Sequence, residues 1–167
     1  MAVDAWRPGR AVSDALLFRP PLPPQTLRLP LVLPIPPTSN HMYHPILRHS
    51  RAGGTHYSLA LTPVAQAWKD EATLAARTWA RTQHWVLADK EWIIIWFRLF
   101  WPDYRRRDVP NLKALWDALE HVIYPNDCWA LPRPLIPQRD PENPRIVLFF
   151  YHASELPEDC SEVSPRA

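Results

Sequence analysis

The stretch that decides the fold runs from Glu91 to Trp101 and reads EWIIIWFRLFW. Side chains on an extended strand point alternately to opposite faces of a sheet. One face of this stretch takes every second residue from Ile93 to Trp101, and the other takes every second residue from Trp92 to Phe100. Because both sets are almost entirely apolar, we predict a strand that is covered on both faces, either by helices or by a second subunit.

Amphipathic helices are predicted on both sides of this strand in the sequence. The first begins at Thr62-Pro63, a capping residue followed by proline at the first helical position, and runs to about Gln83. The second is predicted from Val109 to Val122, with Asp108 as its cap. Apolar residues recur at steps of three or four in each helix. In the first helix they are Val64, Trp68, Ala72, Ala75 and Trp79, and in the second Leu112, Leu115, Trp116, Leu119 and Val122.

The remaining strands complete a mixed sheet. They are predicted over residues 26–34, 56–61, 129–136 and 145–151, and residues 35–55 are predicted to form a long loop. The order β-β-α-β-α-β-β predicts an α+β fold, an α/β sandwich in which two helices pack on one mixed β-sheet.

Composition bounds the kind of protein. The chain has 167 residues, of which 21 are proline, yet it is 47% hydrophobic and holds nine tryptophans, so it can bury a core. We expect a single domain over residues 28–152, between a Pro-rich arm (1–27) and an acidic flexible tail (153–167). Three glycines provide no phosphate-binding loop, so no nucleotide cofactor is expected. Charged residues near the N-terminus, two cysteines and no long apolar run favour a cytoplasmic protein without a membrane partner.

Positive charge is concentrated in the middle of the chain. Residues 40–115 hold eleven Lys and Arg against six Asp and Glu, whereas residues 154–167 hold four acidic residues and one Arg. A basic centre indicates a polyanionic partner.

The densest cluster of charge is PDYRRRDVPNLK at residues 102–113. It places three arginines (105–107), Asp108 and Lys113 where a strand is predicted to lead into a helix, which is a favourable place for phosphate. Asp108 could also hold a divalent cation, and Asp127 is the natural second ligand if the turn after the helix folds back. The alternative is that Asp108 is only a helix cap, Asp127 only a turn residue, and the arginines only a solvated edge.

A second polar cluster lies between residues 33 and 49. It includes Asn40 and Tyr43, followed by Arg48. Basic and aromatic groups interleaved on a loop suit the backbone and unstacked bases of nucleic acids. We therefore interpret this segment as a nucleic-acid contact.

These motifs, in this order, resemble the RusA-type Holliday-junction resolvases. The resemblance covers about residues 30–151. It rests on LPIPPTSN (33–40), Tyr43, Gly54-Thr55-His56 and Trp68-Lys69 in the N-terminal half, and on PDYRRRD (102–108), Asn111, Asp117-Ala118-Leu119 and YPND (124–127) in the C-terminal half.

The resemblance implies a homodimer that cleaves four-way DNA junctions with Mg²⁺ or Mn²⁺ in recombination and repair. Its motif is Asp-x-Asp-Asn, then Lys, then Asp after the next helix. It implies metal ligation by Asp108 and Asp127, and catalytic roles for Asp108, Lys113 and Asp127. The DNA contacts then expected are Asn40, Tyr43, Arg48, Arg105, Arg106, Arg107, Asn111 and Lys113.

One position departs from that motif. The second aspartate is Pro110 here, and proline offers no metal ligand. The sequence therefore leaves three functions open. The first is a metal-dependent endonuclease, the second a catalytically weakened junction-binding protein on the same fold, and the third a non-enzymatic domain whose basic patch contacts RNA or protein.

Overall fold

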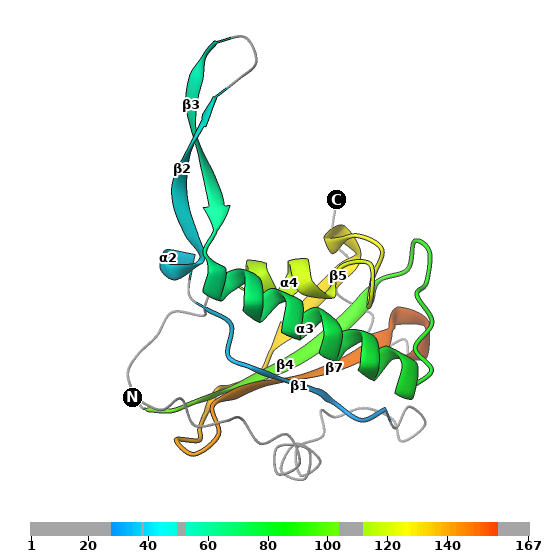
Figure 1. Ribbon diagram of the computed structural model, residues 1–167. Helices are drawn as coiled ribbons and strands as arrows, with labels where there is room; N and C mark the ends of the chain where they lie inside the picture. The colour runs from blue at the N-terminus through cyan, green and yellow to red at the C-terminus, as the bar shows by residue number, and fades with distance from the viewer. Residues whose placement is uncertain (1–27, 38, 50–52, 104–111, 157–167) are drawn as a thin grey trace, which may run out of the picture.

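The structure is a computed structural model, which describes residues 28–37, 39–49, 53–103 and 112–156. Figure 1 shows a layer of helices over a sheet, with a two-stranded ribbon that rises away from both. In chain order the elements are β1 (Leu31–Pro34), α2 (Ser39–Met42), β2 (Tyr43–His49), β3 (Thr55–Leu61), α3 (Pro63–Thr82), β4 (Ile93–Trp101), α4 (Lys113–Leu119), η1 (Asp127–Trp129), β5 (Ala130–Pro134), β6 (Gln138–Arg139), β7 (Arg145–His152) and η2 (Ala153–Glu155).

The main sheet is mixed and has the order β1-β7-β4-β5, with β6 also pairing with β4. β7 lies antiparallel to both β1 and β4, and β5 lies parallel to β4. A parallel neighbour requires a crossover connection, which α4 provides between β4 and β5. The predicted α+β class, with two helices on a mixed sheet, is confirmed.

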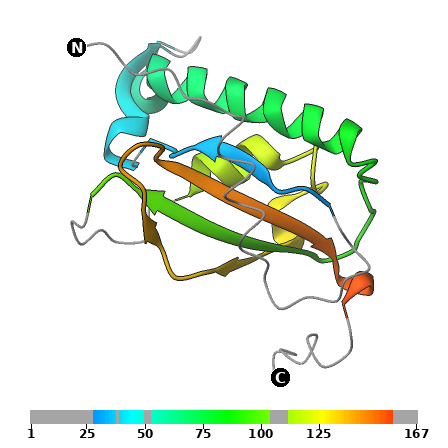
Figure 2. The ribbon, with the colours of Figure 1, turned by 90° about the horizontal axis from the view of Figure 1, so that it is seen from below.

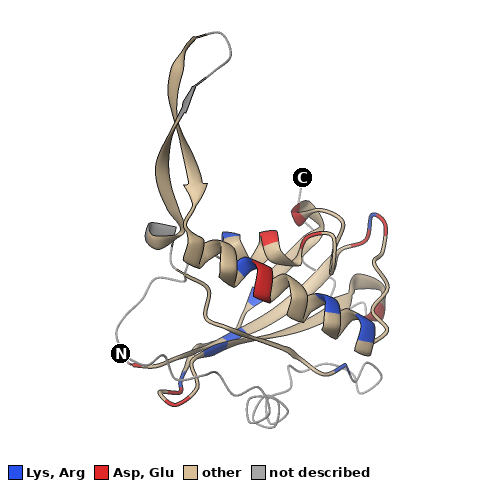
Figure 3. Ribbon diagram, viewed as in Figure 1, with Lys and Arg blue, Asp and Glu red and all other residues tan. Residues whose placement is uncertain are grey.

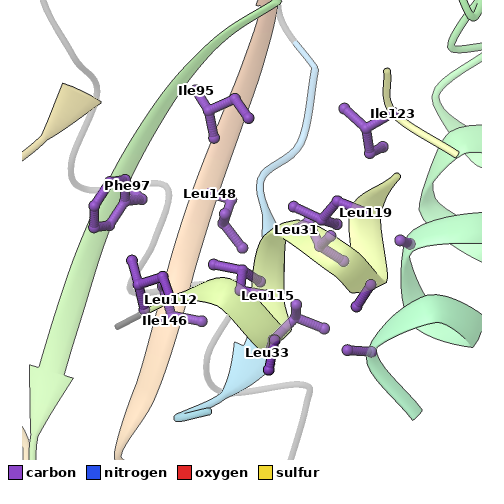
Figure 4. Close-up of a cluster of buried hydrophobic side chains, with 14 of the residues drawn as sticks. Leu31, Leu33, Ile95, Phe97, Leu112, Leu115, Leu119, Ile123, Ile146 and Leu148 are labelled. Carbon is purple, nitrogen blue, oxygen red and sulfur yellow. The ribbon is translucent and has the colours of Figure 1, made fainter. Parts of the chain in front are cut away.

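Both longer helices lie on one side of the sheet (Figure 2). α3 begins where the sequence predicts: the Thr62 hydroxyl accepts a hydrogen bond from the backbone N–H of Ala65 at 3.3 Å. Its buried stripe is shifted slightly from the predicted one, because Val64 is 72% exposed and Ala65 is buried in its place. The core between helices and sheet is shown in Figure 4. It includes Leu31, Leu33, Ile95, Phe97, Leu112, Leu115, Leu119, Ile123, Ile146 and Leu148.

Three indole N–H groups, two from α3 and one from the turn after it, donate hydrogen bonds to backbone carbonyls elsewhere in the domain. Trp68 donates to the carbonyl of Pro34 at 3.3 Å, Trp79 to that of Leu29 at 2.6 Å, and Trp85 to that of Ile123 at 3.0 Å. A buried indole needs such a partner, because an unpaired N–H in an apolar core is costly. These bonds fix β1 and the turn after α4 against the same helix.

The opposite face of the sheet is also buried. Its apolar cluster is centred on Val147 and Phe149 of β7, together with Val32, Phe100 and Tyr151. The guanidinium of Arg145 lies 3.9 Å from the centre of the Phe100 ring and donates to Asp140. Among the described residues, helices cover one face of β4 only, although the side chains on its other face are buried as well.

Two predictions about the chain before α3 are wrong. Residues 35–55 do not form one loop, because they contain α2 and β2, and the strand over 55–61 pairs with β2 and not with the main sheet. Pro45 weakens the strand signal in the sequence, yet a strand with only one paired neighbour tolerates proline on its open edge. A third correction concerns Trp92, which precedes β4 and is 47% exposed where a core position was predicted. The Pro-rich arm lies outside the described residues.

Candidate functional site

Lys113, the predicted catalytic lysine, is the first residue of α4. Its ammonium group lies 3.1 Å from Oδ1 of Asp117, one turn further along the helix, and its side chain is 56% exposed. The hydrogen bond to Asp117 and the charge of that carboxylate raise the pKa of Lys113 above its usual value. The lysine is therefore a stable cation at neutral pH.

The chain reverses direction directly after α4. This helix has seven residues, half the length predicted, so it is about 10 Å long. The N–H of Ile123 donates back to the carbonyl of Leu119 at 2.9 Å, and that of His121 donates to the carbonyl of Tyr124 at 2.8 Å. His121 adopts a left-handed conformation (φ 62°), which allows this tight turn.

Tyr124 holds the reversed segment against α4. Its ring is fully buried, and its hydroxyl donates to the carbonyl of Trp116 at 2.8 Å. Burial, followed by the negative charges of Glu120, Asp127 and Asp117, raises the pKa of Tyr124. The phenol thus remains protonated and can serve as a permanent donor to the helix backbone.

Asp127 follows this turn and begins η1, with an exposed side chain. Asn126 caps η1 by accepting from the N–H of Cys128 at 3.0 Å. Electrostatic interaction with Tyr43 and Asp127 contributes to the raised pKa of Lys113, after the larger effects of Asp117. The sequence puts Asp127 near the far end of a long helix unless the chain folds back over the helix start. The structure places the turn at that far end, where the side-chain amide of Asn126 donates to Oε1 of Glu120 at 3.3 Å, and Asp127 lies within electrostatic range of Lys113 because α4 is short.

The structure does not describe all of the predicted site. Arg105, Arg106, Arg107, Asp108 and Asn111 lie outside the described residues. The N-cap of α4 is Leu112, which makes no side-chain capping bond. The prediction that Asp108 caps this helix is therefore wrong, because the helix begins four residues later than expected.

The polar segment around residue 40 is ordered differently from the predicted loop. Asn40 belongs to α2, and Tyr43 and Arg48 belong to β2. Tyr43 is partly buried and packs against the core, at the base of the ribbon. The bond between Lys113 and Asp117 is the interaction that sequence reasoning missed. The i, i+4 spacing of opposite charges was the available signal.

The described residues provide only part of a metal site. Within this part of the chain, no three His, Cys, Asp or Glu side chains are grouped closely enough to hold a metal ion. Asp127 offers one exposed carboxylate, which fits a hard cation such as Mg²⁺ that keeps several of its waters. The resemblance assigns the second protein ligand to Asp108, which lies outside the described residues.

Comparison of the chain with known proteins gives no significant match, either to a protein-family model or to a curated sequence. None of the helices in the described ranges is both long enough and apolar enough to cross a membrane.

Proposed function

We propose that this protein is a metal-dependent endonuclease that cleaves four-way DNA junctions, with its active site around α4 and the turn after it. The observation that supports the proposal is the position of Lys113 at the start of α4, with the motif residue Asp127 within its electrostatic range although the two lie 14 positions apart in the sequence.

The chain's own groups have distinct roles in this proposal. The Lys113 ammonium would stabilise negative charge on the scissile phosphate, as a positioned cation does in phosphoryl transfer. Asp127, with Asp108, would hold Mg²⁺ or Mn²⁺, which supplies an activated water and charge neutralisation when bound. The arginines at 105–107 would bind flanking phosphates.

The test is cleavage of a synthetic four-way junction with Mg²⁺ or Mn²⁺. We expect cutting by the wild-type chain and a loss of at least about 100-fold in Asp127→Asn and Asp108→Asn, with junction binding retained. Asp70→Asn, on the exposed side of α3, is the matched control and should cut normally. Cutting that survives both Asp127→Asn and Asp108→Asn would contradict the site assignment.

A second candidate is a junction-binding protein with weakened catalysis. It is favoured by Pro110, which removes one carboxylate from the motif, and by the lack of an acidic cluster among the described residues. Tight, metal-independent junction binding without cleavage would select it.

A further inference from the structure

The main sheet has a second buried face, on the side away from α3 and α4. The described helices lie on the other side of the sheet (Figure 2). The apolar cluster on this face comes from β1, β7 and β4. We call it the second face, and it consists of Val32, Trp96, Phe100, Val147, Phe149 and Tyr151.

The low exposure of the second face requires a covering layer. Val147 and Phe149, on β7 in the interior of the sheet, are only 2% and 6% exposed. Neighbouring strands shield the flanks of such side chains, but their outward ends stay open unless another layer packs on them. These exposures hold for a single chain. The covering layer therefore belongs to the same chain and not to a second copy.

The chemistry of the second face limits what this layer can be. Its two central strands, β4 and β7, contain no Asp or Glu (Figure 3). The indole nitrogen of Trp96 is buried and has no hydrogen-bond partner among the described residues. A buried N–H without an acceptor is costly. A suitable layer is therefore apolar and offers backbone carbonyl oxygens.

We propose that the Pro-rich arm, residues 1–27, lies across the second face and forms a third layer of the domain. The arm contains Trp6, the apolar run ALLF (15–18) and the proline-rich run RPPLPP (19–24). Proline has no N–H, and an extended Pro-rich segment leaves its carbonyl oxygens free, so it can cover an apolar surface without burying unpaired donors. Surfaces lined by aromatic side chains are the usual binding sites of such segments.

The composition of the other segments outside the described residues is less suitable. Residues 104–111 hold four charged side chains among eight residues, and residues 157–167 hold four among eleven. Covering aromatic side chains with either segment would bury charge at a high cost. Residues 38 and 50–52 are too few to cover a sheet.

The arm joins the described structure beside the second face, and it is long enough to cross it. Arg28 donates to both carboxylate oxygens of Glu155, at 2.7 and 2.6 Å, and the next residue, Leu156, packs against the second face. An extended Pro-rich chain rises about 3.1 Å per residue, so residues 1–27 span up to about 80 Å. The eight residues of β7 span about 27 Å. This proposal stands independently of the nuclease activity.

The first test is photocrosslinking within the full chain. A p-benzoylphenylalanine in place of Trp96 should crosslink to a peptide from residues 1–27, which mass spectrometry identifies. The same group in place of Leu74, which is 63% exposed on α3, should not reach the arm. A crosslink from position 96 to residues 157–167, a covalent dimer, or no crosslink to residues 1–27 would each overturn the proposal.

The second test measures access to the second face without a bulky probe in the chain. In a C128S/C160S background, Val147→Cys and Ile146→Cys place a thiol on the second face and on the helix side of β7, because neighbouring residues of a strand point to opposite faces. Maleimide should label both slowly. L16S/L17S/F18S should raise the labelling rate at position 147 relative to position 146 at least about 10-fold, because only the second face opens.

The ratio of the two rates removes any effect of the arm variant on the stability of the whole domain. The control E158S/D159S/E162S changes three residues after Leu156 and should leave the ratio unaltered. An unaltered ratio in L16S/L17S/F18S would overturn the proposal. Rapid labelling of Val147→Cys beside the native arm would do the same, as would a raised ratio in the control.

Discussion

The Nζ atom of Lys113 lies 3.1 Å from Oδ1 of Asp117, so the lysine at the start of α4 is paired along its own helix. This bond and the negative charge of Asp117 raise the pKa of Lys113. A lysine held in its charged form cannot accept a proton at neutral pH. Its contribution to catalysis would therefore be electrostatic, toward the phosphate.

We predict that Lys113→Met lowers the single-turnover rate of junction cleavage by about 100-fold, because one positioned cation is removed, while junction affinity changes only a few-fold. Lys113→Arg should recover part of the rate, since it keeps the charge. Lys90→Met, at an exposed position outside the site, is the control. A Lys113→Met enzyme that cuts at the wild-type rate would remove Lys113 from the active site.

Tyr124 is predicted to be a positioning residue for Asp127. Tyr124→Phe removes the hydrogen bond to the Trp116 carbonyl and should lower the free energy of unfolding by about 1 kcal/mol. It should also raise the Mg²⁺ concentration needed for half-maximal cleavage, because the turn that carries Asp127 is less firmly held. Tyr57→Phe, whose ring is 81% exposed, should change neither the unfolding midpoint nor the metal requirement. An unaltered metal requirement in Tyr124→Phe would confine Tyr124 to a structural role.

The parts of the fold that were predicted correctly are those in which one feature of the local sequence is strong enough to decide the structure. β4 follows from an unbroken apolar run, and the start of α3 follows from Thr62-Pro63. β2 was missed because Pro45 contradicts a strand and because its stabilising partner, β3, is itself mostly exposed. Because most side chains of β3 are exposed, its sequence shows no alternation of buried and exposed residues that would predict a strand.

The members of the candidate site stay a prediction, and the local geometry after Lys113 could not be predicted from the sequence. The length of α4 could not be obtained from apolar spacing, because Val122 and Ile123 continue the pattern of the helix while the backbone has already turned at His121. That turn sets where Asp127 lies relative to α4. A left-handed histidine leaves no trace in hydrophobic periodicity.

The end of the sheet near η2 is predicted to make stability fall in acid. Arg28 donates to both carboxylate oxygens of Glu155, at 2.6 and 2.7 Å, and lies over the Trp85 ring. Burial acts to raise the pKa of Glu155, but the bonds from Arg28 and from the N–H of His152 outweigh it and the pKa is lowered. The bond from Ser154 likewise lowers the pKa of Glu91.

Because these folded-state pKa values lie below those of the unfolded chain, the unfolded chain takes up protons first as the pH falls. The stabilisation is complete above the ordinary glutamate range, near pH 4.5, and is lost as the pH falls through the folded values. We expect the thermal midpoint to drop steeply below about pH 4.5, and Glu155→Gln to flatten that drop. Glu71→Gln on the exposed side of α3 should leave it unchanged. If the thermal midpoint of Glu155→Gln falls in acid just as that of the wild type does, the ion pair between Arg28 and Glu155 is not the cause of the fall.

The arginines at 105–107 are predicted to bind phosphate. R105A/R106A/R107A should weaken junction binding and reduce the salt slope of affinity by about 0.9 for each phosphate that the protein no longer neutralises. R77A/R81A/K90A removes the same charge from exposed positions on and after α3 and should leave the slope almost unchanged. Equal slopes for the two triple variants would mean that the effect is one of net charge only.

Pro110 provides the sharpest test of catalysis, because the motif has a carboxylate where this chain has none. With Asp108 and Asp127 as ligands and water completing the coordination, we expect the wild type to cut junctions. Pro110→Asp should then increase the Mn²⁺-dependent rate at least about 10-fold, since a further carboxylate tightens metal binding. Pro110→Ala removes the proline without adding a metal ligand, so it measures the effect of freeing the backbone alone. This variant should cut like the wild type. If Pro110→Ala and Pro110→Asp accelerate cleavage equally, the proline acts through the backbone, and the missing carboxylate does not limit the reaction.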